Sequence, residues 1–375
     1  MIVLSFVLLA ALLLLAAGAL YDRLWDRRLS LTLDFSAPEA VEGDTLTLRE
    51  ELVNQKPLPI PMLTARFRLS RNLVFSGEGE AAVSDHYYRS DIFAVNFYQR
   101  VVRRLDFVCA KRGYYRVEDM SLAAAGLLNS HALVKPLHSA ATLTVLPRPV
   151  PFEEMDILYR QVMGDVEVKR FTNPDPFAFR GIREYLPGDD FRHVNFKASA
   201  KNGELMVNVY NPTATREIVI LLNLDPYAAV CRDSVHEGAI RLAASAAARF
   251  IGMGLTVGMV CNGRDVLDGS TLAERAGGGA DHLHTLLVRL ARISLPAGTD
   301  SFEDMMPLPE TGRQGGAQPY YLLISANEGG SLPEAYQRLA QAGGASWVVP
   351  VYEGGGKDAT AAQQRMGIRY WEVVS

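Results

Sequence analysis

The residues best suited to chemistry lie in one stretch of the sequence, RGIREYLPGDDFRHVNFKASAKNGELMVNVYNP, which begins at residue 180. Charged side chains crowd around a single Pro-Gly turn in this stretch, namely the cations Arg180, Arg183, Arg192, Lys197 and Lys201 and the acids Glu184, Asp189 and Asp190. An arginine binds a carboxylate through two parallel hydrogen bonds, so we expect Asp189 to pair with Arg183 or Arg192, or to accept backbone N–H bonds. The sequence predicts an ion-paired clasp rather than an active site, because arginines without a nucleophile or a positioned base seldom catalyse a reaction.

The same stretch indicates how the clasp is held. Gly188 follows Pro187 and fits the third position of a type II turn, which requires a positive φ. Phe191, Val194 and Phe196 are expected to form an apolar seat beneath the charged groups. Two roles stay open for the clasp: a structural brace that joins two domains, or a docking surface for a partner protein.

Other chemical apparatus is sparse in the sequence. It contains neither the phosphate-binding pattern GxxxxGK[ST] nor the nucleophile elbow GxSxG. Cys231 lies five residues before His236, but a buried structural cysteine is the commoner outcome of such a spacing. The sequence therefore predicts a protein that is not an enzyme.

One position favours a hard cation. Asp225 ends the apolar run REIVILLNLD, where a metal-adhesion site of the von Willebrand factor A type has the pattern Asp-x-Ser-x-Ser. Here Tyr227 and Ala229 occupy the two serine positions, and Ser325-Ala326 stands where that type of site supplies another carboxylate. Too few oxygen ligands remain for a tight site, so we predict no cofactor, with Mg²⁺ at Asp225 as the weaker alternative.

Apolar runs alternate with helical patterns in the C-terminal part of the chain. The run REIVILLNLD is typical of a strand that is covered on both faces, and LTVGMVCNG, YYLLIS and SWVVPVY follow it. Between them lie three segments with helical periodicity, DSVHEGAIRLAASAAARFIGMG, ADHLHTLLVRLARI and LPEAYQRLAQAGG. This alternation predicts a doubly wound, mostly parallel, Rossmann-like α/β sheet over residues 212–375.

Residues 29–147 have a different pattern. Short segments such as LSLTLDFS, TLTLREELVN and TARFRLS alternate apolar and polar residues with period two. This spacing predicts an all-β sandwich of the immunoglobulin or fibronectin type. Asp85, His86 and Asp91 gather in one of its segments, which we interpret as a solvated loop because a metal site normally has three or four ligands. Residues 148–211 form the linker between the domains and contain the charged clasp.

The first twenty residues, MIVLSFVLLAALLLLAAGAL, have no charged side chain. As a helix, residues 1–20 would span ~30 Å, which is the thickness of the hydrocarbon core of a bilayer. A cleaved signal peptide is the alternative, since small residues near the end of the run suit a cleavage site. Such a peptide normally starts with a positive segment, which is missing here, so a retained transmembrane helix is favoured.

Charged and aromatic residues follow the apolar run. Arg23, Arg27 and Arg28 favour, by the positive-inside rule, a single-pass anchor with its soluble domains in the cytoplasm. Tyr21 and Trp25 are expected as aromatic residues at the membrane interface.

Composition and charge limit the partners of the chain. Its 375 residues are too many for one ordinary core, 49% of them are hydrophobic, and the net charge of −4 comes without a basic block. We therefore expect no nucleic acid among the partners. Three cysteines, Cys109, Cys231 and Cys261, lie far apart, which argues against a disulfide framework and suits a reducing compartment.

The charged stretch resembles the signature of the bacterial family known as domain of unknown function 58, G-x-R-x-Y-x-x-G-D-x-x-R-x-I-x-W-x-x-S-A-R. The sequence departs from this pattern at Val194, Phe196 and Lys201, and matches it at Gly181, Arg183, Tyr185, Gly188, Asp189, Arg192, Ser199 and Ala200. The segments VEGDTLTLREELVNQKPLPIPML and RGYYRVEDMSLAAAGLLN are similar to the region that precedes the signature in that family. The resemblance extends over residues 30–352 and implies a membrane-anchored protein with a von Willebrand factor A-like domain.

The resemblance also implies a partner. Members of this family are commonly encoded beside a MoxR-type AAA+ ATPase, with which they are thought to assemble or remodel envelope-associated complexes. We therefore expect a non-enzymatic adaptor that binds such an ATPase or its client, and a divalent-cation-dependent ligand-binding module is the alternative. The residues assigned to the partner-binding surface or structural clasp are Arg180, Gly181, Arg183, Tyr185, Gly188, Asp189, Arg192, Lys197 and Ser199.

Overall fold

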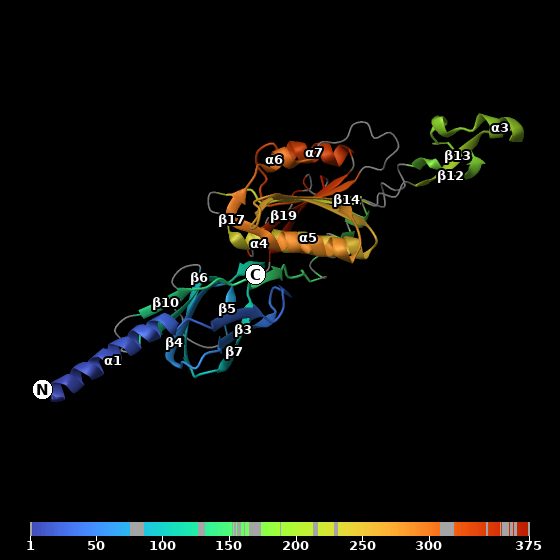
Figure 1. Cartoon of the computed structure of the whole chain (residues 1–375). Coiled ribbons are helices and arrows are strands. Elements are labelled where there is room, and N and C mark those ends of the chain that lie inside the picture. The colour runs from blue at the N-terminus through green and yellow to red at the C-terminus, as the bar shows by residue number, and fades with distance from the viewer. Residues whose placement is uncertain are drawn as a thin grey trace. The chain divides into compact units, whose positions relative to one another are not determined.

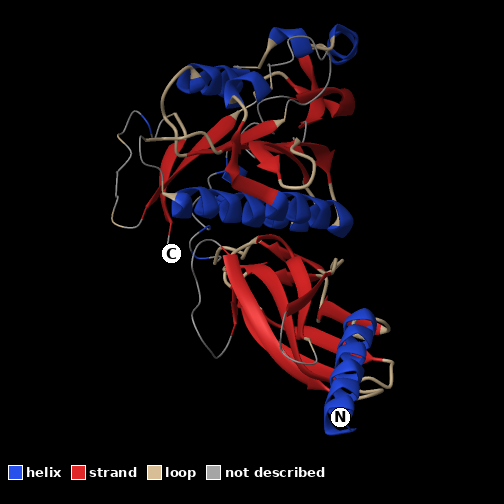
Figure 2. Cartoon of the chain, turned by 60° about the vertical axis from the view of Figure 1, so that its left-hand side comes forward, coloured by secondary structure: helices blue, strands red, loops and turns tan. Residues whose placement is uncertain are grey.

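A computed structural model describes the greater part of the chain, in two compact units, Met1–Arg148 and Pro149–Ser375. Both units appear in Figure 1 and, from another side, in Figure 2. The described residues are 2–75, 86–126, 132–151, 153, 155, 159–160, 162–164, 174–187, 189–212, 217–228, 232–307, 319–342, 344–352, 354, 360, 363 and 366–373.

The first unit, blue to green in Figure 1, consists of one long helix and a set of short strands. The helix α1 covers Ile2–Leu24, and Leu4–Leu24 is long and apolar enough to cross a membrane. The helix thus continues past the predicted segment 1–20. The strands are β1 (Leu29–Phe35), β2 (Glu39–Val41), β3 (Thr45–Asn54), β4 (Ile60–Ser70), β5 (Leu73–Phe75), β6 (His86–Val95), β7 (Arg100–Cys109), β8 (Gly113–Arg116), β9 (Glu118–Ala125), β10 (Ala132–Pro136) and β11 (Thr142–Leu146).

These strands form two four-stranded sheets of order β1-β3-β7-β5 and β10-β9-β4-β6, and a smaller sheet of order β2-β11-β8. The alternation seen in the sequence places one face of each strand in a shared core. Leu48 of β3, Phe67 of β4 and Phe107 of β7 are almost completely buried there. The predicted β-sandwich is therefore confirmed.

The C-terminal end of α1 belongs to the sandwich core. Tyr21 and Trp25, which are four residues apart and so lie on one side of the helix end, are both 5% exposed and pack with the sandwich. Both rings therefore contact the sandwich core, and their predicted place at the membrane interface stays a prediction. Their burial joins the helix rigidly to the sheet that begins at Leu29.

The second unit, green to red in Figure 1, contains a mixed sheet with helices and a separate hairpin. Its strands are β12 (Pro174–Glu184), β13 (Met206–Pro212), β14 (Glu217–Asn223), β15 (Thr256–Asp265), β16 (Thr271–Gly277), β17 (Ile293–Thr299), β18 (Tyr320–Ser325), β19 (Ala345–Tyr352) and β20 (Ile368–Val373). Its helical segments are η1 (Phe191–His193), α3 (Phe196–Asn202), α4 (Asp233–Gly252), α5 (Ala280–Arg292), α6 (Phe302–Met305) and α7 (Leu332–Ala342).

The large sheet is seven-stranded and has the order β16-β15-β14-β18-β19-β20, with β17 paired to β15. Strands β15, β14, β18, β19 and β20 run parallel, whereas β16 and β17 are antiparallel to β15. The mostly parallel sheet that the alternation of strands and helices predicts is thus present. The two antiparallel strands were not predicted, because neither segment has a long apolar run.

Helices cover both faces of this sheet, α4 and α5 on one side and α6 and α7 on the other (Figures 1 and 2). Successive side chains of β14 point to opposite faces, so Leu222 packs with α4 whereas Leu221 packs with Leu332 and Tyr336 of α7. The side chains of this one buried strand therefore contribute to two hydrophobic cores, one on each face of the sheet. This is why its sequence is a continuous apolar run rather than an alternating one.

Strands β12 and β13 pair with each other in an antiparallel hairpin, with η1 and α3 between them in sequence. We call residues 174–212 the signature module. The side chain of Asn195 caps α3 by accepting a hydrogen bond from the N–H of Ala198 (3.0 Å). The helix ends at Gly203, which has a φ of 77° that glycine adopts without strain.

Candidate functional site

The signature module is closed by a two-pronged ion pair. Arg183, near the end of β12, donates to Asp189 through Nη1 to Oδ2 and Nη2 to Oδ1, at 2.6 Å each. Asp189 also accepts a hydrogen bond from the backbone N–H of Leu186 (2.8 Å). The bonds from Arg183 and then from Leu186 lower the pKa of the Asp189 carboxyl to about 2. The carboxylate is therefore ionised at neutral pH and ties the end of β12 to the following turn.

Two other predicted residues hold the inside of the module. The Ser199 hydroxyl donates to the carbonyl of Asn195 and accepts from the N–H of Met206, both at 2.8 Å, so it ties α3 to β13. The ring of Tyr185 lies 5.6 Å from that of Phe191, measured between centroids. Both positions are therefore explained by the folding of the module itself.

The remaining predicted residues lie in β12, on the surface, or outside the described residues. Gly181 pairs with Val209 across the hairpin. Arg192 and Lys197 are exposed, and it is Arg183 that forms the two-pronged pair with Asp189. Gly188 and the side chain of Arg180 are outside the described residues, and with them the predicted type II turn.

The predicted apolar seat is wrong for two of its three residues. Val194 is buried and forms a bridge with Val207. Phe191 in η1 and Phe196 at the start of α3 are instead 60% and 71% exposed. A two-stranded hairpin with one short helix has too little interior to enclose three large side chains.

Large apolar side chains are therefore concentrated on the surface of the module. The exposed ones are Phe179, Ile182, Leu186, Phe191, Phe196 and Leu205. We call these six residues the exposed apolar set. Large exposed apolar patches on a soluble unit mark sites of protein or membrane interaction.

A second candidate site lies at the carboxyl edge of the parallel sheet, between β14 and β18. Ligands of open α/β sheets bind at this kind of switch point, where the direction of winding reverses. Asn223, Asn262 and Ser325 are buried at this edge. Asn223 Nδ2 donates to Ser325 Oγ (3.2 Å), and Asn262 Nδ2 donates to Asn223 Oδ1 (3.3 Å), so a chain of hydrogen bonds crosses three neighbouring strands.

Asp225 lies at the end of this chain. Its Oδ1 accepts hydrogen bonds from Asn262 Nδ2 (2.8 Å) and from Thr299 Oγ1 (3.1 Å). Within the described parts of the chain, no group of three or more His, Cys, Asp and Glu side chains could hold a metal ion. Of the two groups that meet Asp225 Oδ1, the Thr299 hydroxyl could also ligate a hard cation through its oxygen, whereas the Asn262 Nδ2 could not. Of the two residues at the serine positions of the metal-site pattern, Tyr227 has neither a carboxylate nor an aliphatic hydroxyl, and Ala229 is outside the described residues.

A cleft of about 420 Å³ opens at the same edge of the sheet. It is comparable in size with small-ligand pockets, which have volumes of roughly 300–1,000 Å³. The guanidinium of Arg232 lies 4.2 Å from the ring centroid of Tyr352, one of the lining residues. Cys231 is outside the described residues, so its position relative to His236 is not described. Burial lowers the pKa of His236. The lining of the cleft includes Tyr227, Val235, Asn327, Glu328, Pro350 and Tyr352.

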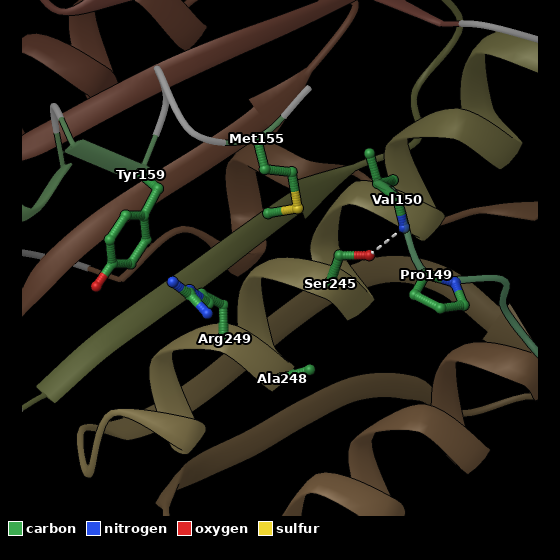
Figure 3. Close-up of a pocket in the computed structure, with 7 residues that line it drawn as sticks. All are labelled: Pro149, Val150, Met155, Tyr159, Ser245, Ala248 and Arg249. Carbon is green, nitrogen blue, oxygen red and sulfur yellow. Dashed lines mark hydrogen bonds between the residues drawn. The ribbon is translucent and has the colours of Figure 1, made fainter. Parts of the chain in front are cut away.

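A smaller pocket of about 290 Å³ lies beside α4, and Figure 3 shows its lining. Ser245 Oγ accepts a hydrogen bond from the N–H of Val150 (2.8 Å). The guanidinium of Arg249 lies 5.0 Å from the ring centroid of Tyr159. The beginning of the predicted linker 148–211 therefore packs on α4, and we assign this pocket a structural role.

Sequence reasoning missed Asn223 and Asn262, which hold the carboxyl edge together. A signal was present, because each is a polar residue that interrupts an apolar run, in VILLNLD and VGMVCNG. A buried side-chain amide must find partners, and neighbouring parallel strands bring such residues to one edge.

Comparisons with known proteins agree with part of this description. Residues 181–325 match the family described as "Protein of unknown function DUF58". This segment includes most of the signature module and the sheet as far as β18. No curated protein matches the chain.

Solved structures are similar to parts of the chain at low scores. The CARDB domain of a Pyrococcus furiosus protein, solved with di-metal ions, is 11% identical, with coverage of 31% of this chain and 93% of that domain and a TM-score of 0.20. The sixth cohesin of Acetivibrio cellulolyticus scaffoldin B is 12% identical, with coverage of 31% and 99% and a TM-score of 0.22. The seventh ScaB type I cohesin of Pseudobacteroides cellulosolvens is 13% identical, with coverage of 32% and 94% and a TM-score of 0.21. Scores of this size support no inference about function.

Proposed function

We propose that this chain is a membrane-tethered, non-enzymatic adaptor whose signature module docks onto a partner protein. The observation that carries the proposal is the exposed apolar set on a module that the Arg183–Asp189 pair holds closed. The anchor is α1, which is long and apolar enough to cross a membrane. The arginines after the helix favour a cytoplasmic location for the soluble units.

Docking is favoured by the exposure of aromatic side chains within the module itself. Phe191 and Phe196 are 60% and 71% exposed there, so their rings are available to a partner. Aromatic side chains with arginine nearby are the typical energetic centres of protein interfaces. The same segment exposes three cations, Arg192, Lys197 and Lys201, and three acids, Glu184, Asp190 and Glu204, so the complementary surface has an apolar centre with charged groups of both signs around it.

The partner that the family resemblance implies is an AAA+ ATPase of the MoxR type, or a client of that ATPase. The match of residues 181–325 to the family supports this choice, because it includes most of the proposed docking module.

The second candidate function is a divalent-cation-dependent binding module of the von Willebrand factor A type. The position of Asp225 after β14, at the switch point of a mostly parallel sheet, is the observation that favours it. Calorimetric titration of the full chain with Mg²⁺ and Mn²⁺, with Asp225→Asn as the control, separates the two functions. Saturable heat that the substitution abolishes would support the cation-dependent module instead of the adaptor.

Affinity purification of the full chain from membranes tests the adaptor. The chain carries a tag after Ser375, is co-expressed with a MoxR-type ATPase, and is compared with Phe196→Ala and Arg183→Glu variants. Leu267→Ala is the matched control, because Leu267 is an exposed apolar residue of the same unit outside the signature module. We expect both module variants to lose the ATPase and the control to retain it.

The Arg183→Glu variant needs its own check. It places a glutamate next to Asp189, so it unfolds the module if the Arg183–Asp189 pair is essential for folding. Arg183→Lys keeps the charge but cannot form the two-pronged bond, so an intermediate recovery of the ATPase is expected. Recovery of the ATPase with Phe196→Ala at the wild-type level contradicts docking through the exposed apolar set.

A further inference from the structure

The loop between β6 and β7 carries two exposed aromatic side chains. Phe97 is 63% exposed and Tyr98 is 68% exposed. The loop lies at the end of the sandwich where β1 begins, since Val53 of β3 pairs with Arg100 of β7 and Leu29 of β1 pairs with Asn54. The aromatic loop and the end of α1 are therefore at the same end of the sandwich.

Hydrogen bonds join this loop to the residues that follow α1. The N–H of Tyr98 donates to the carbonyl of Lys56 (3.2 Å), and the N–H of Gln55 donates to the carbonyl of Arg28 (2.9 Å). Backbone hydrogen bonds thus join the turn after α1 to the loop after β3, and the loop after β3 to the loop after β6. We call residues 25–28, 55–59 and 96–99 the helix-proximal end.

The buried amide of Asn54 fixes both loops of this set. Asn54 is 1% exposed, and its Nδ2 donates to the carbonyls of Leu58 (2.9 Å) and Asn96 (2.8 Å). Its backbone N–H donates to the carbonyl of Gln99 (2.9 Å). The buried Asn54 therefore holds both ends of the aromatic loop, and the side chains of Phe97 and Tyr98 at its tip are exposed.

The backbone of the helix-proximal end is unusual as well. Arg28 and Tyr98 have φ values of 52° and 51°, and Asp119 is the only other non-glycine residue among those described with a positive φ. Such conformations cost roughly 1–3 kcal/mol each and persist only where the surrounding structure holds the backbone in place.

Geometry places this end close to any bilayer that α1 spans. The apolar span ends at Leu24, and the following turn is compact because the N–H of Arg27 donates to the carbonyl of Leu24 (3.2 Å). Four residues reach at most ~14 Å, so Arg28 lies within about that distance of the end of the span. Because Tyr21 and Trp25 are buried in the sandwich core, the sandwich cannot swing away from the helix end.

The charges of this end suit anionic head groups. Arg23, Arg27 and Arg28 are exposed. Of the two nearby acids, Asp26 is paired with Lys135, at 3.3 Å from Oδ2 to Nζ, and Asp22 is only partly exposed. Aromatic rings prefer the interfacial layer of a bilayer, and arginines beside them bind lipid phosphates.

We propose that the helix-proximal end of the sandwich rests on the bilayer that α1 spans. Phe97 and Tyr98 enter the interfacial layer, and Arg27 and Arg28 bind anionic phospholipid head groups. The contact fixes the orientation of the sandwich relative to the membrane. It rests on the membrane tether of the proposed function, but not on the docking of a partner.

Depth measurements on the full chain in vesicles test this contact. An environment-sensitive nitrobenzoxadiazole dye is attached at Phe97→Cys in a Cys231→Ser background, in phosphatidylcholine vesicles with and without phosphatidylglycerol. Val74→Cys is the matched control, because Val74 is 52% exposed and pairs with Val108 at the opposite end of β7. We expect a blue shift and quenching by lipids with a spin label near the head group at position 97, and neither at position 74. Quenching at position 97 is expected to be stronger in vesicles with phosphatidylglycerol, and the double substitution Arg27→Gln and Arg28→Gln is expected to remove this difference.

The outcomes separate this inference from the tether itself. A chain that does not float with vesicles after alkaline extraction shows that α1 does not span the bilayer, which overturns both. A chain that floats while the dye at position 97 behaves like the dye at position 74 overturns the membrane contact alone.

Discussion

Replacing Glu50 by glutamine is expected to remove most of the pH dependence of the stability of the β-sandwich. Glu50 lies on the inner face of β3, near Leu48, and is 1% exposed. Among the described residues, no hydrogen-bond donor reaches its two carboxyl oxygens. Asp91 enters the same core from β6 and binds the two nearby cations, Arg89 Nε at 2.6 Å and Arg103 Nη1 at 2.5 Å. Of the two buried acids, Asp91 is therefore the one that binds cations, and Glu50 is the one that stays neutral.

The magnitude follows from the pKa of this carboxyl. Burial first, and then the charge of Asp91, raise the pKa of Glu50 to about 8. A glutamate in the unfolded chain titrates near ~4.3. Because the folded state keeps a proton that the unfolded state releases, the stabilisation is complete below about pH 4 and is lost as the pH rises through about 8. At ~1.4 kcal/mol per pH unit, the loss over this window is at most about 5 kcal/mol.

Urea unfolding of the full chain in detergent, read by pulse proteolysis at pH 5 and at about pH 7.5, below the pKa of Lys56, measures this effect. Fragments from residues 29–147 report on the sandwich separately from the second unit. We expect the urea midpoint of the wild-type sandwich to fall between these pH values, and that of Glu50→Gln to change little. Glu51→Gln is the matched control, because Glu51 is the next residue and its pKa is lowered by its bonds to Arg100 and Arg49. Equal falls for the wild type and Glu50→Gln would refute the assignment of a buried neutral acid.

Three further perturbations test other parts of the structure. Gly238→Ala is expected to destabilise the α/β unit by roughly 1–3 kcal/mol, because the new Cβ would lie 2.5 Å from Val373 Cγ1; thermal unfolding measures the loss, and Val373→Ala in the same chain should restore stability. Lys56→Met is expected to stabilise the sandwich at pH 7, since burial lowers the pKa of Lys56 to about 8, and the gain in the urea midpoint should disappear above about pH 10.4, where the unfolded lysine is neutral too. The lowered pKa of Asp189, about 2, predicts that the clasp contributes fully above about pH 4 and is lost as the pH falls through 2; Asp189→Asn should show at neutral pH the faster proteolysis of the signature module that the wild type shows only in acid.

Much of the fold could be predicted from periodicity. The apolar runs of β14, β15, β18 and β19 and the helical stripes of α4, α5 and α7 are long, so the sequence alone defines a mostly parallel sheet with helices. Strands β16 (Thr271–Gly277) and β17 (Ile293–Thr299) could not be predicted, because they form by pairing with β15 at the edge and need no apolar run.

The candidate sites were less predictable, because each depends on contacts between distant segments. The alternation in β3 places Glu50 inward, and the alternation in β6 does the same for Asp91, but only the stacking of two sheets brings both carboxyls together. The interpretation of the Asp91 segment as a solvated loop was therefore wrong for Asp91, which is buried. Phe191 and Phe196 are the reverse case, because they were predicted to be buried and are exposed. The sequence pattern does not show that the surrounding module is too small to enclose them.

The exposed apolar set also sets a limit on the strength of docking. Phe196 is 71% exposed, so complete burial of its ring would remove roughly 140 Å² of surface from water. At ~25 cal/mol per Å², this contributes at most about 3.5 kcal/mol, or roughly a 300-fold change in affinity. A few such contacts give modest binding in dilute solution. Modest binding is sufficient for a tethered adaptor, because a module anchored through α1 meets any partner at the same membrane at a high effective concentration. The anchor and the docking module therefore depend on each other, and removal of α1 should weaken recovery of the partner even though the signature module stays intact.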